Sequence, residues 1–119
     1  DIAVGREFTL LLTDDGVVYG CGSNALGQLG LGPELQVVKQ PMNIGLTSPA
    51  KSISAGKDHS LIMTVDGYYV MGSNEFGQLC TDSGGEPLLV PRALAIDSVV
   101  TEFQAIKSST YILYRDGSV

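Results

Sequence analysis

The sequence predicts an all-β fold assembled from repeated four-stranded antiparallel sheets, and three observations lead to this class. A block at 5–13 returns at 56–64, and an Asp-Gly pair follows each copy. A second block, Gly-Ser-Asn-x-x-Gly-Gln-Leu, occurs at 22–29 and again at 72–79. The apolar runs are short, and no segment longer than a turn or two has helical periodicity. Four short strands repeated every ~40 to 50 residues are typical of a β-propeller blade, so we expect part of a propeller ring.

The repeat divides the chain into a first copy at 1–51, a second at 52–101 and the start of a third at 102–119. Each unit has apolar faces that need a neighbour on both sides. We therefore expect this partial propeller to belong to a larger ring. By itself it should self-associate through its open blade faces and unpaired strand edges.

Hydrophobic patterning predicts the first two strands of each copy. An alternating apolar pair has the period of a half-buried strand, and a run that is apolar on both parities indicates a strand covered on both faces. The pairs are Ile2-x-Val4, Ile53-x-Ala55 and Phe103-x-Ala105, and the runs are 9–13, 60–64 and 110–114. Gly5 and Gly56 separate pair from run in the first two copies, whereas Ile106 takes that position in the third.

Asp-Gly pairs mark the next turn of each copy and predict β-hairpins. Glycine accepts the positive φ that a type I′ turn requires, so Asp-Gly between two apolar runs is a strong hairpin signal. The pairs are Asp15-Gly16, Asp66-Gly67 and Asp116-Gly117, and the returning strands are expected at 17–19 and 68–71, with 118–119 as the remnant of the third.

The outer part of each complete copy combines a constant turn with a variable stretch. The amides of Asn24 and Gln28, and of Asn74 and Gln78, recur once per unit, so we expect them to pair with backbone groups at a turn. The variable stretches are 31–40 and 81–90, and a proline then leads into a further strand at 42–44 and at 93–96.

Composition excludes several classes of function. The net charge is −6, from 7 basic and 13 acidic side chains, and no basic patch forms, so we expect no direct nucleic-acid binding. No apolar run approaches the ~18 residues of a membrane span. The two cysteines, Cys21 and Cys80, lack metal-ligand spacing and favour buried free thiols in a reducing compartment, hence a nuclear or cytoplasmic location.

Two motifs that resemble catalytic or cofactor sites are better explained by structure. Asp58, His59 and Ser60 are consecutive, and neighbouring strand residues point to opposite faces, so they cannot form a catalytic triad. The glycines at 20 and 22 lack the helix that a phosphate-binding loop requires. We expect no catalytic, cofactor-binding or metal-binding residues and no enzymatic activity.

The pattern resembles the repeat of the regulator of chromosome condensation family, a seven-bladed propeller. The second copy matches the family motif at Gly56, His59, Ser60, Leu61, Thr64, Asp66, Gly67, Gly72, Asn74, Gly77, Gln78 and Leu79. The first copy matches through a similar set, including Gly5, Asp15, Gly16, Gly22, Asn24, Gly27, Gln28, Leu29 and Gly30. It departs where Phe8 and Ser109 replace the family's histidine, and where Cys21 and Met71 replace its tryptophan. These departures indicate a diverged member.

The expected function is a non-catalytic scaffold whose loops bind a partner protein. The resemblance implies one specific version, nucleotide exchange on a small Ran-like GTPase. An enzyme inhibitor that inserts a loop and an accessory propeller domain of a larger protein are the alternatives. Loops on a rigid scaffold often carry function, and drift of a solvent-facing surface would explain their variability equally well. The predicted partner-binding residues are Glu34, Gln36, Lys39, Asp82 and Glu86.

Overall fold

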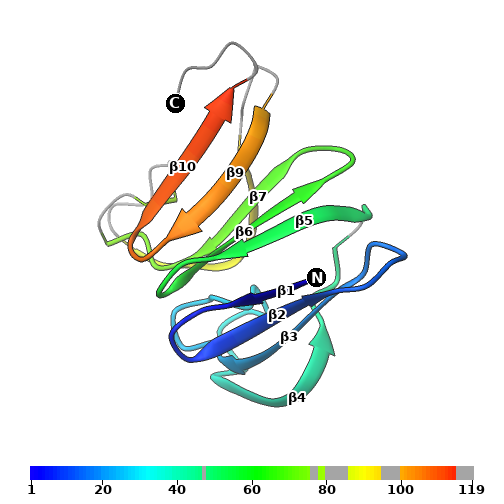
Figure 1. Cartoon of the computed structure of the whole chain (residues 1–119). Helices are drawn as coiled ribbons and strands as arrows, with labels where there is room; N and C mark the ends of the chain where they lie inside the picture. Colours follow the sequence, from blue (N-terminus) through cyan, green and yellow to red (C-terminus); the bar gives the residue numbers. More distant parts are fainter. Residues whose placement is uncertain (47, 76–77, 80–85, 95–99, 115–119) are drawn as a thin grey trace.

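The computed structural model describes residues 1–46, 48–75, 78–79, 86–94 and 100–114, without the side chains of 100–102 and 114. Ten strands and no helix occur in these residues (Figure 1). None of the described residues therefore forms a helix that could cross a membrane. The strands are β1 (Ile2–Val4), β2 (Phe8–Leu12), β3 (Val18–Ser23), β4 (Val37–Asn43), β5 (Ala50–Ala55), β6 (His59–Thr64), β7 (Tyr68–Gly72), β8 (Leu88–Leu94), β9 (Val100–Ile106) and β10 (Ser109–Tyr114).

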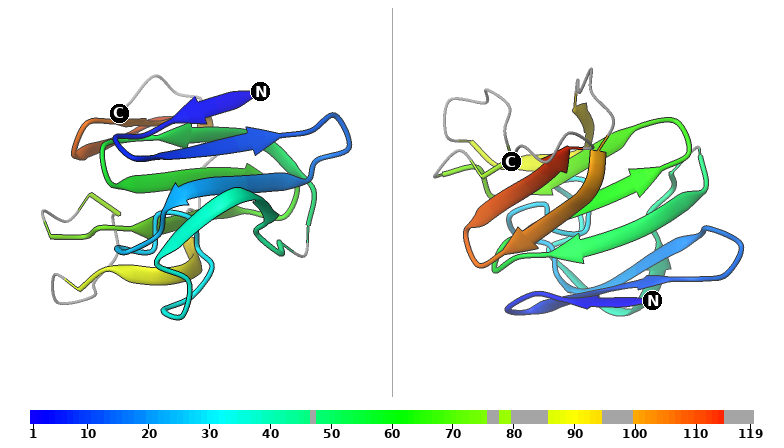
Figure 2. Two further views of the ribbon diagram at one scale, coloured as in Figure 1. Left: turned by 90° about the horizontal axis from the view of Figure 1, so that it is seen from below. Right: turned by 45° about the horizontal axis from the view of Figure 1, so that its top comes forward.

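The strands form three antiparallel sheets, one for each copy of the repeat. The first has the order β1-β2-β3-β4, the second has the order β5-β6-β7-β8, and β9 pairs with β10 in the third. Figure 2 shows the first two sheets stacked with the β9–β10 hairpin beside the second. The predicted four-stranded all-β blades and their inner strands are thus confirmed.

The Asp-Gly hairpins form, but the predicted type I′ geometry is wrong. That turn needs positive φ at both central residues. Lys107 is the only non-glycine residue with positive φ in the described chain, so neither aspartate qualifies. In the first hairpin Gly16 alone is left-handed, with φ 85°, and its N–H donates to the Thr13 carbonyl. In the second, Gly67 donates to the Thr64 hydroxyl at 3.1 Å. The pair at 116–117 lies outside the described residues.

The fourth strand of each blade starts earlier than predicted. β4 begins at Val37 and includes Pro41, and β8 begins at Leu88 and includes Pro91. Both are the outermost strands of their sheets. Proline is tolerated at such an edge because its missing N–H faces away from the ladder. The proline was therefore a wrong marker for the start of the strand.

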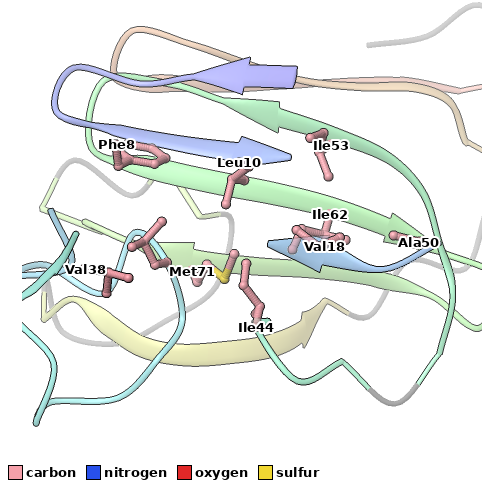
Figure 3. Packing of buried hydrophobic residues seen from close by; sticks show 10 residues of the cluster. Phe8, Leu10, Val18, Val38, Ile44, Ala50, Ile53, Ile62 and Met71 are labelled. Carbon is pink, nitrogen blue, oxygen red and sulfur yellow. The ribbon is translucent and has the colours of Figure 1, made fainter. Parts of the chain in front are cut away.

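The main core lies between the first and second sheets. Its members from the first repeat are Phe8, Leu10, Val18, Leu29, Val38 and Ile44, and its members from the second are Ala50, Ile53, Ile62 and Met71. Figure 3 shows these side chains facing one another from the two sheets. A smaller cluster joins the second sheet to Phe103 and Ala105 of β9. Each sheet therefore buries its apolar face against the next, as propeller blades do.

The glycines at the first turn of each blade leave room for an aromatic ring and do not have a backbone conformation that requires glycine. Neither Gly5 nor Gly56 has positive φ. A Cβ on Gly5 would lie 2.0 Å from the Phe8 ring, and one on Gly56 would lie 2.2 Å from the His59 ring. In the third copy the ring position holds Ser109, and Ile106 takes the glycine position. Glycine and ring thus occur together, and a larger residue stands where the ring is missing.

Candidate partner-binding face

The first variable loop and the first turns of the two complete blades lie at one end of the sheets, which we call the loop face. The start of β2 pairs with the end of β3, through Phe8 and Gly22. The Ser23 N–H then donates to the Glu7 carbonyl at 2.8 Å, and the Ser73 N–H donates to the Asp58 carbonyl at 2.9 Å. The first blade therefore presents its first turn beside the start of its β3–β4 loop, and the second blade presents its first turn beside Ser73.

A buried asparagine holds the first variable loop in place. The Asn24 side chain is 2% exposed, and its Nδ2 donates to the carbonyls of Gly32 at 3.2 Å and Leu35 at 2.7 Å. Its Oδ1 accepts from the Leu29 N–H at 2.9 Å. In the second blade Asn74 Oδ1 accepts from the Leu79 N–H at 3.0 Å. The prediction that these amides pair with backbone at a turn is confirmed for both asparagines and for Gln28, whose Oε1 accepts from the Leu26 N–H at 2.8 Å. The Gln78 amide donates to the Ser73 hydroxyl at 3.4 Å.

The Gly-Gln-Leu turn also ties each loop to the next blade. The Ser60 hydroxyl of β6 donates to the Gln28 carbonyl at 2.6 Å. The Thr110 hydroxyl of β10 makes the same bond to the Gln78 carbonyl. Farther along the first loop, the Gly32 N–H donates to the Leu89 carbonyl of β8 at 2.9 Å. Hydrogen bonds therefore join the first loop and the Gly-Gln-Leu turns to the following blade.

The predicted binding residues fall in three places. Glu34 and Gln36 are exposed on the anchored loop, and the Gln36 amide donates to the Pro33 carbonyl at 3.3 Å. Glu86 is exposed just before β8, the strand that this loop contacts. Lys39 is exposed but lies within β4 rather than in the loop. Asp82 lies outside the described residues.

Two adjacent hollows on the opposite face were not predicted. One, of about 220 Å³, is lined by Asp15, Gly16, Val17, Val18, Asn43, Leu46, Ser48 and Pro49. The other, of about 200 Å³, shares Leu46 and Ser48 with it and also reaches Tyr69 and Pro91. The hydrogen bond from the Thr13 hydroxyl lowers the pKa of Asp15, so the rim is anionic. Their walls come from turns far apart in the chain, and no single motif could have revealed them.

Asp58, His59 and Ser60 make three separate contacts. Asp58 forms an ion pair with Arg6 at 3.1 Å, and Ser60 bonds to the preceding blade. His59 is buried, and its Nε2 lies 3.2 Å from the Ser109 carbonyl and from the Thr110 hydroxyl. Burial lowers the pKa of His59, so the imidazole is neutral at physiological pH. The structure thus gives no catalytic constellation at this motif.

The other residues considered for chemistry are metal ligands, the two cysteines and the glycines at 20 and 22. No cluster of three or more metal-ligating side chains occurs there. Cys21 is a free thiol but is half-buried, so the prediction of full burial was wrong for it. Cys80 lies outside the description. Gly20 lies in β3 against Leu29. Gly22 lies against the Glu7 carbonyl and has φ 104°, so close packing and a left-handed backbone both explain it.

Comparisons with known proteins agree with this architecture. Two models of the regulator of chromosome condensation (RCC1) repeat match, one at residues 15–63 and the other at 1–28 and 50–78. The chain is 35% identical to mouse protein RCC2 over 127 aligned positions, covering 96% of this chain and 24% of that protein. It is 33% identical to the bovine secretion-regulating guanine nucleotide exchange factor, covering 80% of this chain and 21% of that protein.

A solved structure has the same fold as this chain. Human WBSCR16 superposes with a TM-score of 0.86 at 28% identity, over 98% of this chain and 30% of that one. The chain thus spans only about a fifth to a third of the length of these proteins. Repeat models, relatives and fold coincide, and the chain belongs to the regulator of chromosome condensation repeat family of β-propellers.

Proposed function

We propose that the chain is part of a protein-binding scaffold that regulates a small GTPase through its loop face. The observation that carries the proposal is the Asn24 anchor. It fixes the carbonyls of Gly32 and Leu35, and between them the loop exposes Glu34. Gln36 follows directly. A rigid loop with exposed polar side chains loses little conformational entropy on binding, which favours recognition of a folded partner.

The regulatory role is supported by relatives rather than by a site. The bovine relative is named as a guanine nucleotide exchange factor, and the match covers 80% of this chain. Exchange needs no covalent chemistry from the scaffold, because it requires only preferential binding of the nucleotide-free GTPase. This agrees with the described residues, in which repeated polar side chains such as Asn24 and Ser60 make hydrogen bonds within and between the blades. Such a regulator would act in the nucleus or the cytoplasm.

The test uses the full-length protein that carries this segment. Binding to a Ran-like GTPase is measured by calorimetry, and release of a fluorescent nucleotide reports exchange. The double variant Glu34→Lys/Gln36→Lys should weaken binding by roughly tenfold or more, because it reverses charge at the contact. Asp14→Lys makes a similar change on the opposite face and is the matched control.

The outcomes separate the proposal from its alternatives. Loss of binding in the loop variant alone supports the loop face. Equal loss in Asp14→Lys would place the contact elsewhere, and binding without nucleotide release would leave a scaffold that is no exchange factor. Absence of binding to any GTPase tested would contradict the regulatory proposal.

A further inference from the structure

The two hollows opposite the loop face form one groove between the first and second blades, which we call the turn-face groove. The larger, of about 220 Å³, lies against the β2–β3 turn, and the smaller, of about 200 Å³, lies against β7 and β8. Leu46 and Ser48, from the segment that connects β4 to β5, line both. Each hollow is smaller than the ~300 to 1,000 Å³ of sites for drug-sized ligands. The groove is therefore sized for individual side chains of a bound segment.

Hydrogen bonds and close packing fix the shape of the turn-face groove. The Ala50 N–H donates to the Gly16 carbonyl at 2.9 Å and joins the first hairpin to the second sheet. The Ile44 N–H donates to the Val18 carbonyl at 3.0 Å at the other end of the connecting segment. A Cβ on Gly16 would lie 2.7 Å from Pro49, so the turn packs directly on that segment. A groove that is formed before binding reduces the conformational entropy lost when a ligand enters.

Two aspartates from successive hairpins place negative charge at the larger hollow. Asp15 lines this hollow and accepts a hydrogen bond from the Thr13 hydroxyl. Ser48 lines it as well and donates to the carboxylate of Asp66 in the second hairpin. No lysine or arginine is among the described residues that line either hollow. Lys51, the nearest basic residue in sequence, forms no ion pair with a described residue. The larger hollow therefore favours a cationic group.

The rest of the lining is mostly apolar. The apolar side chains are Val17, Val18, Leu46 and Pro49 in the larger hollow, and Ile44, Leu46, Tyr69 and Pro91 in the smaller. Arginine combines an apolar stem with a charged planar head that bonds to carboxylates. The larger hollow, with Asp15 beside apolar walls, complements both parts of an arginine side chain. The described lining of the smaller hollow contains no carboxylate, so this hollow suits an apolar side chain.

We propose that the turn-face groove binds an extended segment of a partner protein, with an arginine in the larger hollow and an apolar side chain in the smaller one. The guanidinium would pair with Asp15 beside Ser48 and Asp66. Its stem would pack on Leu46 and Pro49. Side chains two positions apart lie on the same face of an extended segment, so Arg-x-Leu or Leu-x-Arg is the simplest sequence that fits. The groove is on the face opposite the loop face, and the inference does not depend on the GTPase proposal.

The test measures peptide binding to the full-length protein that carries this segment. The probes are the acetylated peptides Gly-Arg-Ser-Leu-Gly and Gly-Leu-Ser-Arg-Gly, and binding is followed by isothermal titration calorimetry. At least one should bind saturably. Its affinity should fall roughly tenfold or more when citrulline replaces arginine, because citrulline keeps the shape and loses the charge. Serine in place of leucine should also weaken binding, because the smaller hollow is then left unfilled.

Variants of the protein locate the site in the turn-face groove. Asp15→Asn should weaken binding of the arginine peptide by roughly tenfold and leave binding of the citrulline peptide unchanged. Glu75→Gln is the matched control, because it also removes one exposed carboxylate but lies two positions after Ser73 at the loop face. This control should not change the affinity. Circular dichroism checks that both variants fold.

Three outcomes would overturn the proposal. The first is that neither peptide binds saturably. The second is equal affinity for the arginine and citrulline peptides, or equal effects of Asp15→Asn and Glu75→Gln, since the peptide would then respond to something other than the groove. The third is peptide binding that weakens as protein concentration rises, because a second copy would then be the occupant. The citrulline comparison uses the unmodified protein, so it stays decisive even if Asp15→Asn disturbs the turn.

Discussion

The junction between the first and second sheets contains fewer polar side chains than the junction between the second and third at two matching positions. Phe8 fills the ring position at the first junction, whereas His59 fills the same position at the second. Ser54 adds a polar group at the second junction, where it accepts from the Ala105 N–H at 2.8 Å. The matching position of the first sheet holds Ala3. One backbone frame therefore supports both an apolar and a polar junction, provided glycine leaves room for the ring.

The polar junction has a weakness that the apolar one lacks. His59 Nε2 faces the Ser109 carbonyl and so carries the proton, which leaves Nδ1 as an acceptor. That Nδ1 is buried and has no hydrogen-bond partner among the described residues. Burial of an unsatisfied polar atom costs ~1 to 3 kcal/mol. The second junction should therefore be the less stable of the two.

The largest expected difference is between Phe8→Ala and His59→Ala. Phe8→Ala removes a buried ring and should lower the free energy of unfolding by ~3 to 5 kcal/mol. His59→Ala should cost less, ~1 to 2 kcal/mol, because it also removes the unsatisfied nitrogen. Urea unfolding followed by circular dichroism measures both. Equal losses would mean that the two junctions do not differ as described.

Gly56→Ala tests whether the glycine is required by its neighbours. The added Cβ would lie 2.2 Å from the His59 ring and 2.5 Å from the Lys107 carbonyl, so the junction must shift. Overpacking of this kind costs ~1 to 3 kcal/mol. Adding His59→Ser should recover only part of the loss, because the carbonyl contact remains. Full recovery would assign the whole effect to the ring.

Ser60→Ala removes the hydroxyl that joins the second blade to the Gln28 carbonyl. The bond is buried and 2.6 Å long, so its loss should cost ~1 to 2 kcal/mol. Thr9→Ala is the control, because Thr9 holds the matching position in the first blade and its hydroxyl makes no hydrogen bond to another blade among the described residues, so it should have a smaller effect. Thermal unfolding of both variants measures the contrast. An effect of Thr9→Ala as large as that of Ser60→Ala would mean that the bond to Gln28 is not what stabilises the junction.

The pH dependence of stability should come from the second junction. Because burial lowers the pKa of His59, the unfolded chain binds a proton at a pH where the folded chain does not. This stability is present above the ordinary histidine pKa of ~6.5 and is lost as the pH falls through the folded value. His59→Phe places the ring of the first junction at the second. In this variant the urea midpoint should change less between pH ~7 and ~5 than in the unmodified chain. An unchanged slope would assign the dependence to other groups.

The smallest expected effect belongs to the ion pair at the rim of the first junction. Arg6 and Asp58 have side chains that are 50% and 19% exposed. A half-exposed pair is screened by water and salt, so a double-mutant cycle with Arg6→Gln and Asp58→Asn should give ~0.2 to 1 kcal/mol. The coupling should fall in high salt. A coupling that salt does not change would indicate a packing contribution instead.

Repetition made most of the fold predictable from the sequence. Two copies that agree at Asp15-Gly16 and Asp66-Gly67 fix where strands turn. Alternation correctly marks Ile53 as buried, whereas Ile2, at the matching position of the first copy, is 64% exposed. The amide roles of Asn24 and Gln28 followed from the same reasoning. Where the copies diverge, prediction was weaker. Lys39 was assigned to a loop but lies in β4, because pairing with β3 extends a strand into a stretch with little pattern.

The sequence by itself determined the all-β class, the blade spacing and the hairpins, because short-range turn chemistry and hydrophobic period are local properties. Only the tertiary structure decided what each repeated polar or glycine residue contacts. Gly5 is required by the Phe8 ring rather than by its own φ, and the Ser60 hydroxyl bonds to a carbonyl 32 positions away. The hollows beside Asp15 and the exposed face at Ile2 likewise depend on how separate sheets meet. Contacts between sheets depend on side-chain positions in three dimensions, and no local pattern encodes them.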